Sequence, residues 1–122
     1  MTRTNEKVRD LPESSVRYPT PDAGAAGVAN ALGKLEGRWK LVILFHLFDG
    51  KVKRFSELER AIPSVSQKML AQQLRALETD GLVRRVVYPQ VPPKVEYALT
   101  EWGQELCPVL DALLTWADTK PE

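Results

Sequence analysis

The chain has 122 residues, and its 17 Lys and Arg nearly balance its 16 Asp and Glu, which gives a net charge of +1 with the single histidine neutral. This length suffices for one hydrophobic core but is too short for a separate effector domain, and the small net charge excludes a uniformly basic chain. One cysteine excludes an internal disulfide.

The N-terminal part, residues 1–22, is polar and charged, with three prolines and few aliphatic side chains. Such a composition predicts a flexible tail. We expect the folded domain to cover residues 23–118 and residues 119–122 to form a second, short tail. The first tail carries four cations: Arg3, Lys7, Arg9 and Arg17. They either contact DNA or simply keep the tail soluble, and the second interpretation is the simpler.

Two helices are expected at the start of the domain. Residues 25–35 are rich in alanine and predict the first helix, with Gly37 as the left-handed residue that ends it. Residues 38–48 are apolar nearly all round and predict the central helix of the core. The longest apolar run lies here, is short and is interrupted by His46, so we expect no membrane partner and a cytoplasmic location.

A short helix and a tight turn come next. Ser56 followed by Glu59 has the spacing of a capping box, which predicts a helix over residues 57–61. Pro63 ends it, and Pro63, Ser64 and Val65 lead directly to Ser66, the expected N-cap of the following helix. This connection is short enough for a helix-turn-helix.

The second helix of the pair, residues 66–78, is amphipathic. Leu70, Leu74 and Leu77 recur at i, i+4 and i+7 and predict a buried stripe, and Gly81 supplies the stop. The same pattern is typical of an ordinary surface helix with a solvated polar face, so the neighbouring elements must decide. Its polar side chains can bond base edges and phosphates in a major groove: Ser66, Gln67, Lys68, Gln72 and Arg75.

A basic β-hairpin follows the second helix. Residues 82–87 and 95–99 are β-branched and apolar and predict two strands, joined by a proline-rich loop over residues 88–94. The loop would protrude as a wing, although a merely solvated hairpin has the same pattern. Three cations on or beside it could meet the phosphate backbone: Arg84, Arg85 and Lys94.

Charge is divided along the chain. Residues 51–94 contain nine Lys and Arg against four Asp and Glu, a net of +5, whereas residues 95–122 contain one against six, a net of −5. The basic part coincides with the expected helix-turn-helix and hairpin, so it favours nucleic acid as the partner of this surface.

Four segments closely resemble the HxlR-type transcriptional regulators. They are residues 37–40 (GRWK), 54–58 (RFSEL), 66–70 (SQKML) and 88–100, which ends in VEYALT. The resemblance covers about residues 28–118. It implies a mainly α fold with a small β-hairpin (α+β), a winged helix-turn-helix with extra N- and C-terminal dimerisation helices. It also implies a small bacterial DNA-binding regulator, usually a homodimer, that responds to a chemical signal.

The last segment, from a Thr100 cap to Asp118, predicts a long helix with a wide apolar stripe. A stripe of this width indicates an association surface, although a helix packed back onto its own core has the same pattern. The family resemblance favours dimerisation through this helix and the first one. The expected interface residues are Trp102, Leu106, Val109, Leu110, Leu113 and Trp116.

The signal that such a regulator would sense is less well defined by the sequence. Some family members carry a cysteine at the start of the first helix, but residues 23–27 (AGAAG) contain none. Cys107 has no basic neighbour within a turn, so we expect a small buried side chain rather than a reactive thiol. A small-molecule pocket lined by Trp39, Trp102 or Trp116 is an open possibility.

Catalysis, a cofactor and a metal site are not expected. The chain has no glycine-rich phosphate loop and no Gly-x-Ser-x-Gly elbow, and one histidine with one cysteine does not make a structural zinc site. The sequence therefore predicts a homodimer that inserts residues 66–78 into successive major grooves of a pseudo-palindromic operator, about 34–36 Å apart. The alternative is a winged helix that binds another protein, with its arginines as rim contacts.

Overall fold

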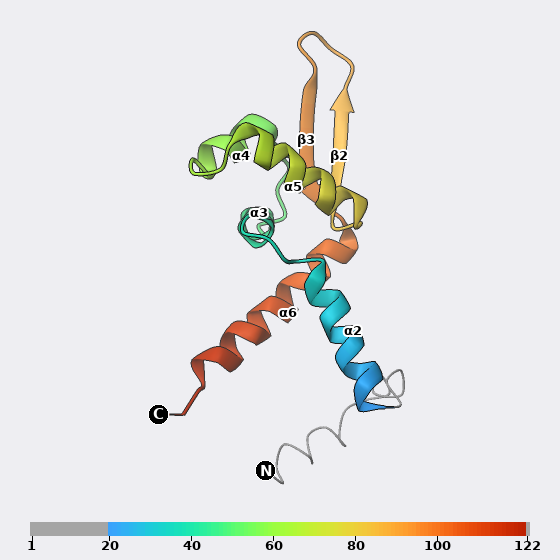
Figure 1. Ribbon diagram of the computed structural model, residues 1–122. Coiled ribbons are helices and arrows are strands. Elements are labelled where there is room, and N and C mark those ends of the chain that lie inside the picture. The colour runs from blue at the N-terminus through green and yellow to red at the C-terminus, as the bar shows by residue number, and fades with distance from the viewer. Residues whose placement is uncertain (1–19, 122) are drawn as a thin grey trace. The chain divides into compact units, whose positions relative to one another are not determined.

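The computed structural model describes residues 20–121, which fall into two compact units that meet between Leu35 and Glu36. The described part of the first unit is helix α2, Pro21–Gly33 (Figure 1). It begins four residues before the predicted start because Thr20 is its N-cap: the Thr20 hydroxyl accepts from the Ala23 amide at 3.1 Å. A Thr-Pro-Asp start favours a helix, since proline fits the first turn and an acidic side chain there interacts favourably with the positive end of the helix dipole.

The other expectations for this region need two corrections. Helix α2 ends at Gly33 with Lys34 as its C-cap, so Gly37 does not end it, although Gly37 does adopt a positive φ of 117°. Residues 20–22 belong to the cap and first turn of α2 rather than to a tail. The four cations assigned to the N-terminal tail lie outside the described residues: Arg3, Lys7, Arg9 and Arg17.

Helix α3, Lys40–Leu47, opens the second unit and supplies the centre of its core. Ile43, Leu44 and Leu47 are completely buried. The prediction of a core helix is right for this face only, because three other apolar side chains of α3 remain 37–49% exposed: Leu41, Val42 and Phe45.

Helices α4, Phe55–Ala61, and α5, Gln67–Thr79, form the helix-turn-helix. Helix α4 begins two residues earlier than predicted, because Glu57 accepts a hydrogen bond from the Arg54 amide at 2.7 Å. Ser56 is therefore the second residue of the helix and not its N-cap. The start of α5 is confirmed: the Ser66 hydroxyl accepts from the Met69 amide at 3.0 Å.

The second helix also ends and packs as predicted. Gly81 follows Asp80, the C-cap of α5, and has a φ of 82°. The leucine stripe of α5 is completely buried: Leu70, Leu74 and Leu77 have no exposed surface.

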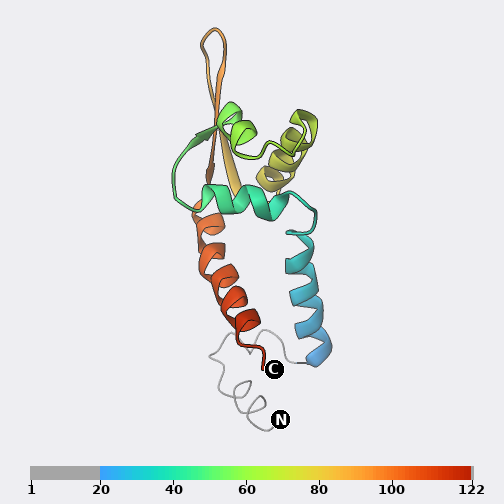
Figure 2. The same cartoon turned by 90° about the vertical axis from the view of Figure 1, so that its left-hand side faces the viewer.

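The sheet has three antiparallel strands in the order β1-β3-β2: Lys53–Arg54, Lys94–Leu99 and Val83–Tyr88. The hairpin of β2 and β3 was predicted to within one residue, and it projects beyond α4 and α5 (Figures 1 and 2). Strand β1 was not predicted, because a two-residue strand is too short to show alternation.

Helix α6, Glu101–Asp118, starts at the base of the sheet. Its N-cap, Thr100, accepts from the Gly103 amide at 3.0 Å and donates its hydroxyl to the Gly81 carbonyl at 2.6 Å. The helix continues through Pro108, and only Gly103 and Leu110 are buried along it. In both views it runs away from α4, α5 and the hairpin (Figures 1 and 2). No helix among residues 20–121 is long and apolar enough to cross a membrane.

Candidate nucleic-acid interface

Helix α5 presents a continuous polar face. Lys68, Gln72 and Arg75 stand at i, i+4 and i+7, on the side opposite the buried leucine stripe, and all three are exposed. Gln67 is also exposed but lies to one side of this row, at the first turn beside Ser66. The helix therefore offers two cations and an amide in one line, which suits contacts to phosphates and base edges.

The two arginines of the hairpin lie on opposite faces of the sheet. Arg84 pairs with Ala98 and Arg85 pairs with Tyr97, and successive side chains of a strand alternate between faces. Arg85 shares its face with Val83 and Tyr97, which are buried against the helices. The Tyr97 ring centroid lies 6.4 Å from that of Phe55 in α4, so this is the helix-side face.

The other face, here called the outer face, carries Arg84, Tyr88, Lys94 and Glu96. The two arginines of the hairpin therefore cannot approach one DNA strand from the same side. The prediction grouped the two arginines by their place on the hairpin, although neighbouring residues of the predicted strand must alternate between its faces. Only the choice of the face that packs against the helices depends on the tertiary structure.

Lys94 is already engaged within the chain. Its ammonium group lies 3.4 Å from the Glu96 carboxylate and 4.8 Å from the centre of the Tyr88 ring. The pKa of Glu96 is lowered, first by the hydrogen bond from the Tyr88 hydroxyl and next by the charge of Lys94. The same contact raises the pKa of Tyr88, since ionising the phenol would place two negative charges side by side. The positive charge of Lys94 is thus partly compensated within the hairpin.

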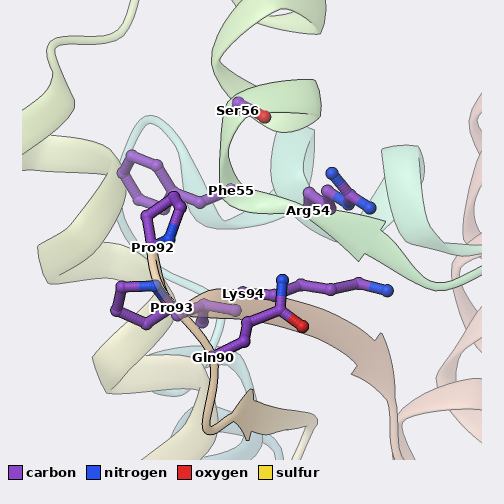
Figure 3. Close-up of a pocket in the computed structure, with 8 residues that line it drawn as sticks. Arg54, Phe55, Ser56, Gln90, Pro92, Pro93 and Lys94 are labelled. Atoms are coloured by element: carbon purple, nitrogen blue, oxygen red, sulfur yellow. The ribbon is translucent and has the colours of Figure 1, made fainter.

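A pocket of about 310 Å³ lies between the wing loop and the start of α4 (Figure 3). Its apolar lining consists of Phe55, Pro92, Pro93 and Val95. Its polar lining consists of Arg54, Ser56, Gln90 and Lys94. Of these eight residues the sequence indicated only Lys94 as a binding residue, because the pocket arises where two segments far apart in the chain meet.

The residues proposed for a sensory site are spread over the second unit. Trp39 is half-buried under the guanidinium of Arg38, 4.8 Å from the ring centroid, whereas Trp102 and Trp116 are 53% and 72% exposed on α6. None of the three lines the pocket at the wing. Cys107 is a free thiol and is only half-buried, so it is less enclosed than predicted. Among residues 20–121 no group of three or more His, Cys, Asp and Glu is arranged to hold a metal ion.

Helix α6 leaves much of its apolar stripe uncovered. Five large apolar side chains on it are at least half exposed: Trp102, Val109, Leu113, Leu114 and Trp116. Leu106 is half-buried, and Leu110 is only 7% exposed, so little of Leu110 is available to a partner. The apolar surface predicted from the sequence is therefore present, apart from the position of Leu110.

Comparison with known proteins gives a consistent result. A protein-family model described as HxlR-like helix-turn-helix matches residues 34–122. The HTH-type transcriptional regulator YtcD of Bacillus subtilis is 56% identical over 89 residues, which cover 73% of this chain and 70% of YtcD.

Solved structures agree with the sequence matches. A crystal structure of YtcD has a TM-score of 0.68 at 54% identity, with 75% of this chain and 92% of that chain covered. The redox regulator HypR in its reduced form has a TM-score of 0.69 at 47% identity, covering 76% and 91%. A regulator from Enterococcus faecalis V583, described as of the MarR family, has a TM-score of 0.73 at 40% identity, covering 78% and 86%.

Proposed function

This chain belongs to the HxlR-like helix-turn-helix family and is a DNA-binding transcriptional regulator, and from this premise we propose that it acts as a homodimer on an inverted-repeat operator. The observation that carries the proposal is the exposed row of Lys68, Gln72 and Arg75 on α5, beside a hairpin that projects past the helices (Figure 1). A helix of about 10–12 Å diameter fits a major groove of about 12 Å.

The side chains of α5 divide into two roles in this proposal. Gln67 and Gln72 read base edges, because an amide can bond adenine through two hydrogen bonds at once. Lys68 holds a phosphate, since its charge attracts any sequence equally. Arg75 can do either, and Ser66 donates its hydroxyl to a phosphate while its oxygen caps the helix.

The wing contact falls to Arg85 rather than to Arg84. Helix α5 lies on the helix-side face of the hairpin, so a duplex seated on α5 is closer to Arg85 than to the outer face. We expect Arg85→Ala to weaken binding to every duplex and to reduce the salt dependence by about one unit of slope, as for one lost phosphate contact. Arg84→Ala is the matched control, and a larger effect from it would reverse the assignment.

Dimerisation is proposed from the uncovered apolar surface. The exposed stripe of α6 is large for a soluble single chain, and α2 exposes Val28 and Leu32 in addition. Surfaces of this kind mark association sites, and the commonest soluble oligomer is a twofold dimer. A twofold axis places the two copies of α5 in grooves about 34–36 Å apart, as an inverted repeat requires.

The test is selection of duplexes from a random library, followed by titration of the selected duplex and an unrelated one at several salt concentrations. We expect an inverted repeat with a strong preference over the control duplex. Gln72→Ala should alter the selected bases, whereas Lys68→Ala should weaken all duplexes alike. Unselective or salt-insensitive binding would instead favour a protein-binding role for the winged helix.

The proposal also includes a location and a mode of control. A regulator that binds DNA acts in the cytoplasm of a prokaryotic cell, by binding alone and without catalysis. Two neighbouring structures are of a redox regulator named HypR. Residues 23–27 of this chain contain no cysteine, so a small-molecule signal fits it better than a thiol at that position.

A further inference from the structure

The pocket at the wing has two chemically different sides. In Figure 3 the rings of Phe55, Pro92 and Pro93 gather on one side, and Arg54 and Lys94 lie on the other. Its volume of about 310 Å³ is at the small end of the range for ligand sites. The pocket therefore fits a small molecule with a flat apolar body and one polar end.

The polar side favours a negative charge. Within residues 20–121 the Arg54 guanidinium forms no ion pair, and its charge acts on Glu96 from a distance. Lys94 adds a second cation, partly compensated by Glu96. Because Glu96 does not line the pocket, the nearest charges around a ligand are both positive.

Two neutral donors complete this side. The hydroxyl of Ser56 is not used as a helix cap, since the cap position is Arg54, and it has no hydrogen bond among the described residues. The amide of Gln90 is carried by a turn in which the Gln90 backbone N–H donates to the Tyr88 carbonyl at 2.9 Å. A carboxylate has two acceptor oxygens, and it can take a guanidinium and a hydroxyl together.

We propose that this pocket binds a small aromatic carboxylate and that the ligand is an effector of DNA binding. The ring packs against Phe55, Pro92 and Pro93, and the carboxylate accepts from Arg54 and Ser56. The regulatory part rests on the proposed DNA-binding function, because the pocket joins the wing to the first helix of the helix-turn-helix. A ligand there fixes the wing loop relative to the start of α4, and this restraint weakens DNA binding.

The first experiment measures ligand binding without DNA. The full chain, labelled with ¹⁵N, is titrated with 4-fluorobenzoate, and backbone amide shifts are followed by NMR. A ligand of this size is expected to bind with a dissociation constant on the order of 1 mM. The shift changes should be largest at Ser56, Gln90 and Val95. Changes centred on Trp39, Trp102 or Trp116, or no change at all, would overturn the proposal.

The second experiment asks whether charge recognition is the cause. Arg54→Gln keeps the backbone N–H that caps α4 and should weaken 4-fluorobenzoate binding about tenfold, the loss expected for one charged hydrogen bond. Arg60→Gln is the matched control, because Arg60 is an exposed arginine of the same helix that does not line the pocket. The neutral 4-fluorobenzamide should bind the native chain about as weakly as the acid binds Arg54→Gln. Equal affinities for the two probes would contradict the proposal.

The third experiment concerns regulation. Saturating 4-fluorobenzoate should weaken binding of the native chain to its selected duplex several-fold, and sodium chloride at equal ionic strength is the control. An unchanged DNA affinity with a filled pocket would overturn the effector role. Failure of the DNA selection would contradict the proposed function but would not bear on ligand binding in the pocket. The first experiment tests ligand binding without DNA.

Discussion

Helices α5 and α6 carry similar apolar stripes but differ in how much of the stripe is buried. Helix α5 has 13 residues and buries three leucines completely, whereas α6 has 18 residues and buries only Gly103 and Leu110. Helical periodicity therefore identifies the side chains that gain from burial, but it does not identify what covers them. For α5 the cover comes from the same chain, and for α6 we propose that it comes from a second copy.

Topology explains the difference. Helix α5 lies between α3 and the base of the hairpin, so its stripe faces the centre of the second unit. Helix α6 touches the sheet near its first turn and then runs away from it (Figure 2). The later turns of α6 keep Val109, Leu113 and Trp116 at least half exposed.

The same substitution in both helices tests the comparison, and its largest effect is expected in α5. Leu74→Ala removes a fully buried side chain and should lower the free energy of unfolding by about 2–5 kcal/mol. Urea denaturation followed by circular dichroism measures the loss. Gln72→Ala on the exposed face of α5 is the control and should change stability by less than about 0.5 kcal/mol. A loss below about 1 kcal/mol for Leu74→Ala would contradict the described core.

The junction between α6 and the sheet gives the second prediction. A Cβ atom at Gly103 would collide with the backbone carbonyl of Leu82, which cannot move away as a flexible side chain could. Gly103→Ala should therefore destabilise the chain by about 1–3 kcal/mol, despite the higher helix propensity of alanine. Thermal unfolding measures this, with Glu105→Ala as a control at an exposed position of α6. A stabilised Gly103→Ala variant would show that α6 packs on Leu82 less closely than described.

Much of the fold could be predicted from local signals. The start and end of α5 follow from Ser66 and Gly81, and α6 follows from Thr100, because caps and positive-φ glycines act within a few residues. The start of α4 was misplaced for a related reason. The spacings Arg54 to Glu57 and Ser56 to Glu59 overlap there. The backbone N–H of Arg54, rather than the hydroxyl of Ser56, is the group that is bonded.

Less of the candidate site could be predicted, because it depends on tertiary geometry. The polar residues of α5 are exposed as expected, but which of the two hairpin arginines lies on the face that packs against the helices became clear only from the tertiary structure. The pairing of Lys94 with Glu96 and Tyr88 arises only when residues of two strands face each other. Strand β1 and the pocket beside Arg54 depend in the same way on contacts across the sheet.

The third prediction concerns α6 and the proposed dimer. Leu113 is 50% exposed in the single chain, so Leu113→Ala should hardly change the stability of the monomer at low protein concentration. It should weaken dimerisation about tenfold, the result of losing roughly 1.4 kcal/mol at an apolar contact. Sedimentation equilibrium measures the association constant. Glu105→Ala, on the same helix, is the control.

Protein concentration separates the two helices in this test. For a dimer that folds and associates together, stability rises with concentration, whereas a core mutation acts at every concentration. Leu74→Ala should therefore lower the free energy of unfolding by the same amount at every protein concentration. Leu113→Ala should lower only the part of that free energy that depends on protein concentration. A concentration-independent loss in Leu113→Ala would place this side chain in intrachain packing.

The smallest effect is expected at Glu96, where the basic hairpin contains its own counter-charge. Because the folded-state pKa of Glu96 is lowered from its ordinary value of 4.5, its ion pair stabilises the fold above that pH and ceases to do so as the pH falls through the folded-state pKa. Glu96→Gln should therefore be slightly less stable than the native chain at pH 7, and this difference should be smaller at pH 3. Denaturation at both pH values measures the difference, with Glu105→Gln as the control.

The same substitution has an opposite effect on function. Without the Glu96 carboxylate, Lys94 no longer shares its charge within the hairpin and becomes available to a phosphate. We therefore expect Glu96→Gln to bind its selected duplex more tightly at low salt, with a steeper salt dependence, while it loses stability at neutral pH. A parallel loss of both properties would mean that the Lys94–Glu96 pair positions the wing for DNA, and that the carboxylate acts as a support rather than as a competitor of the phosphate.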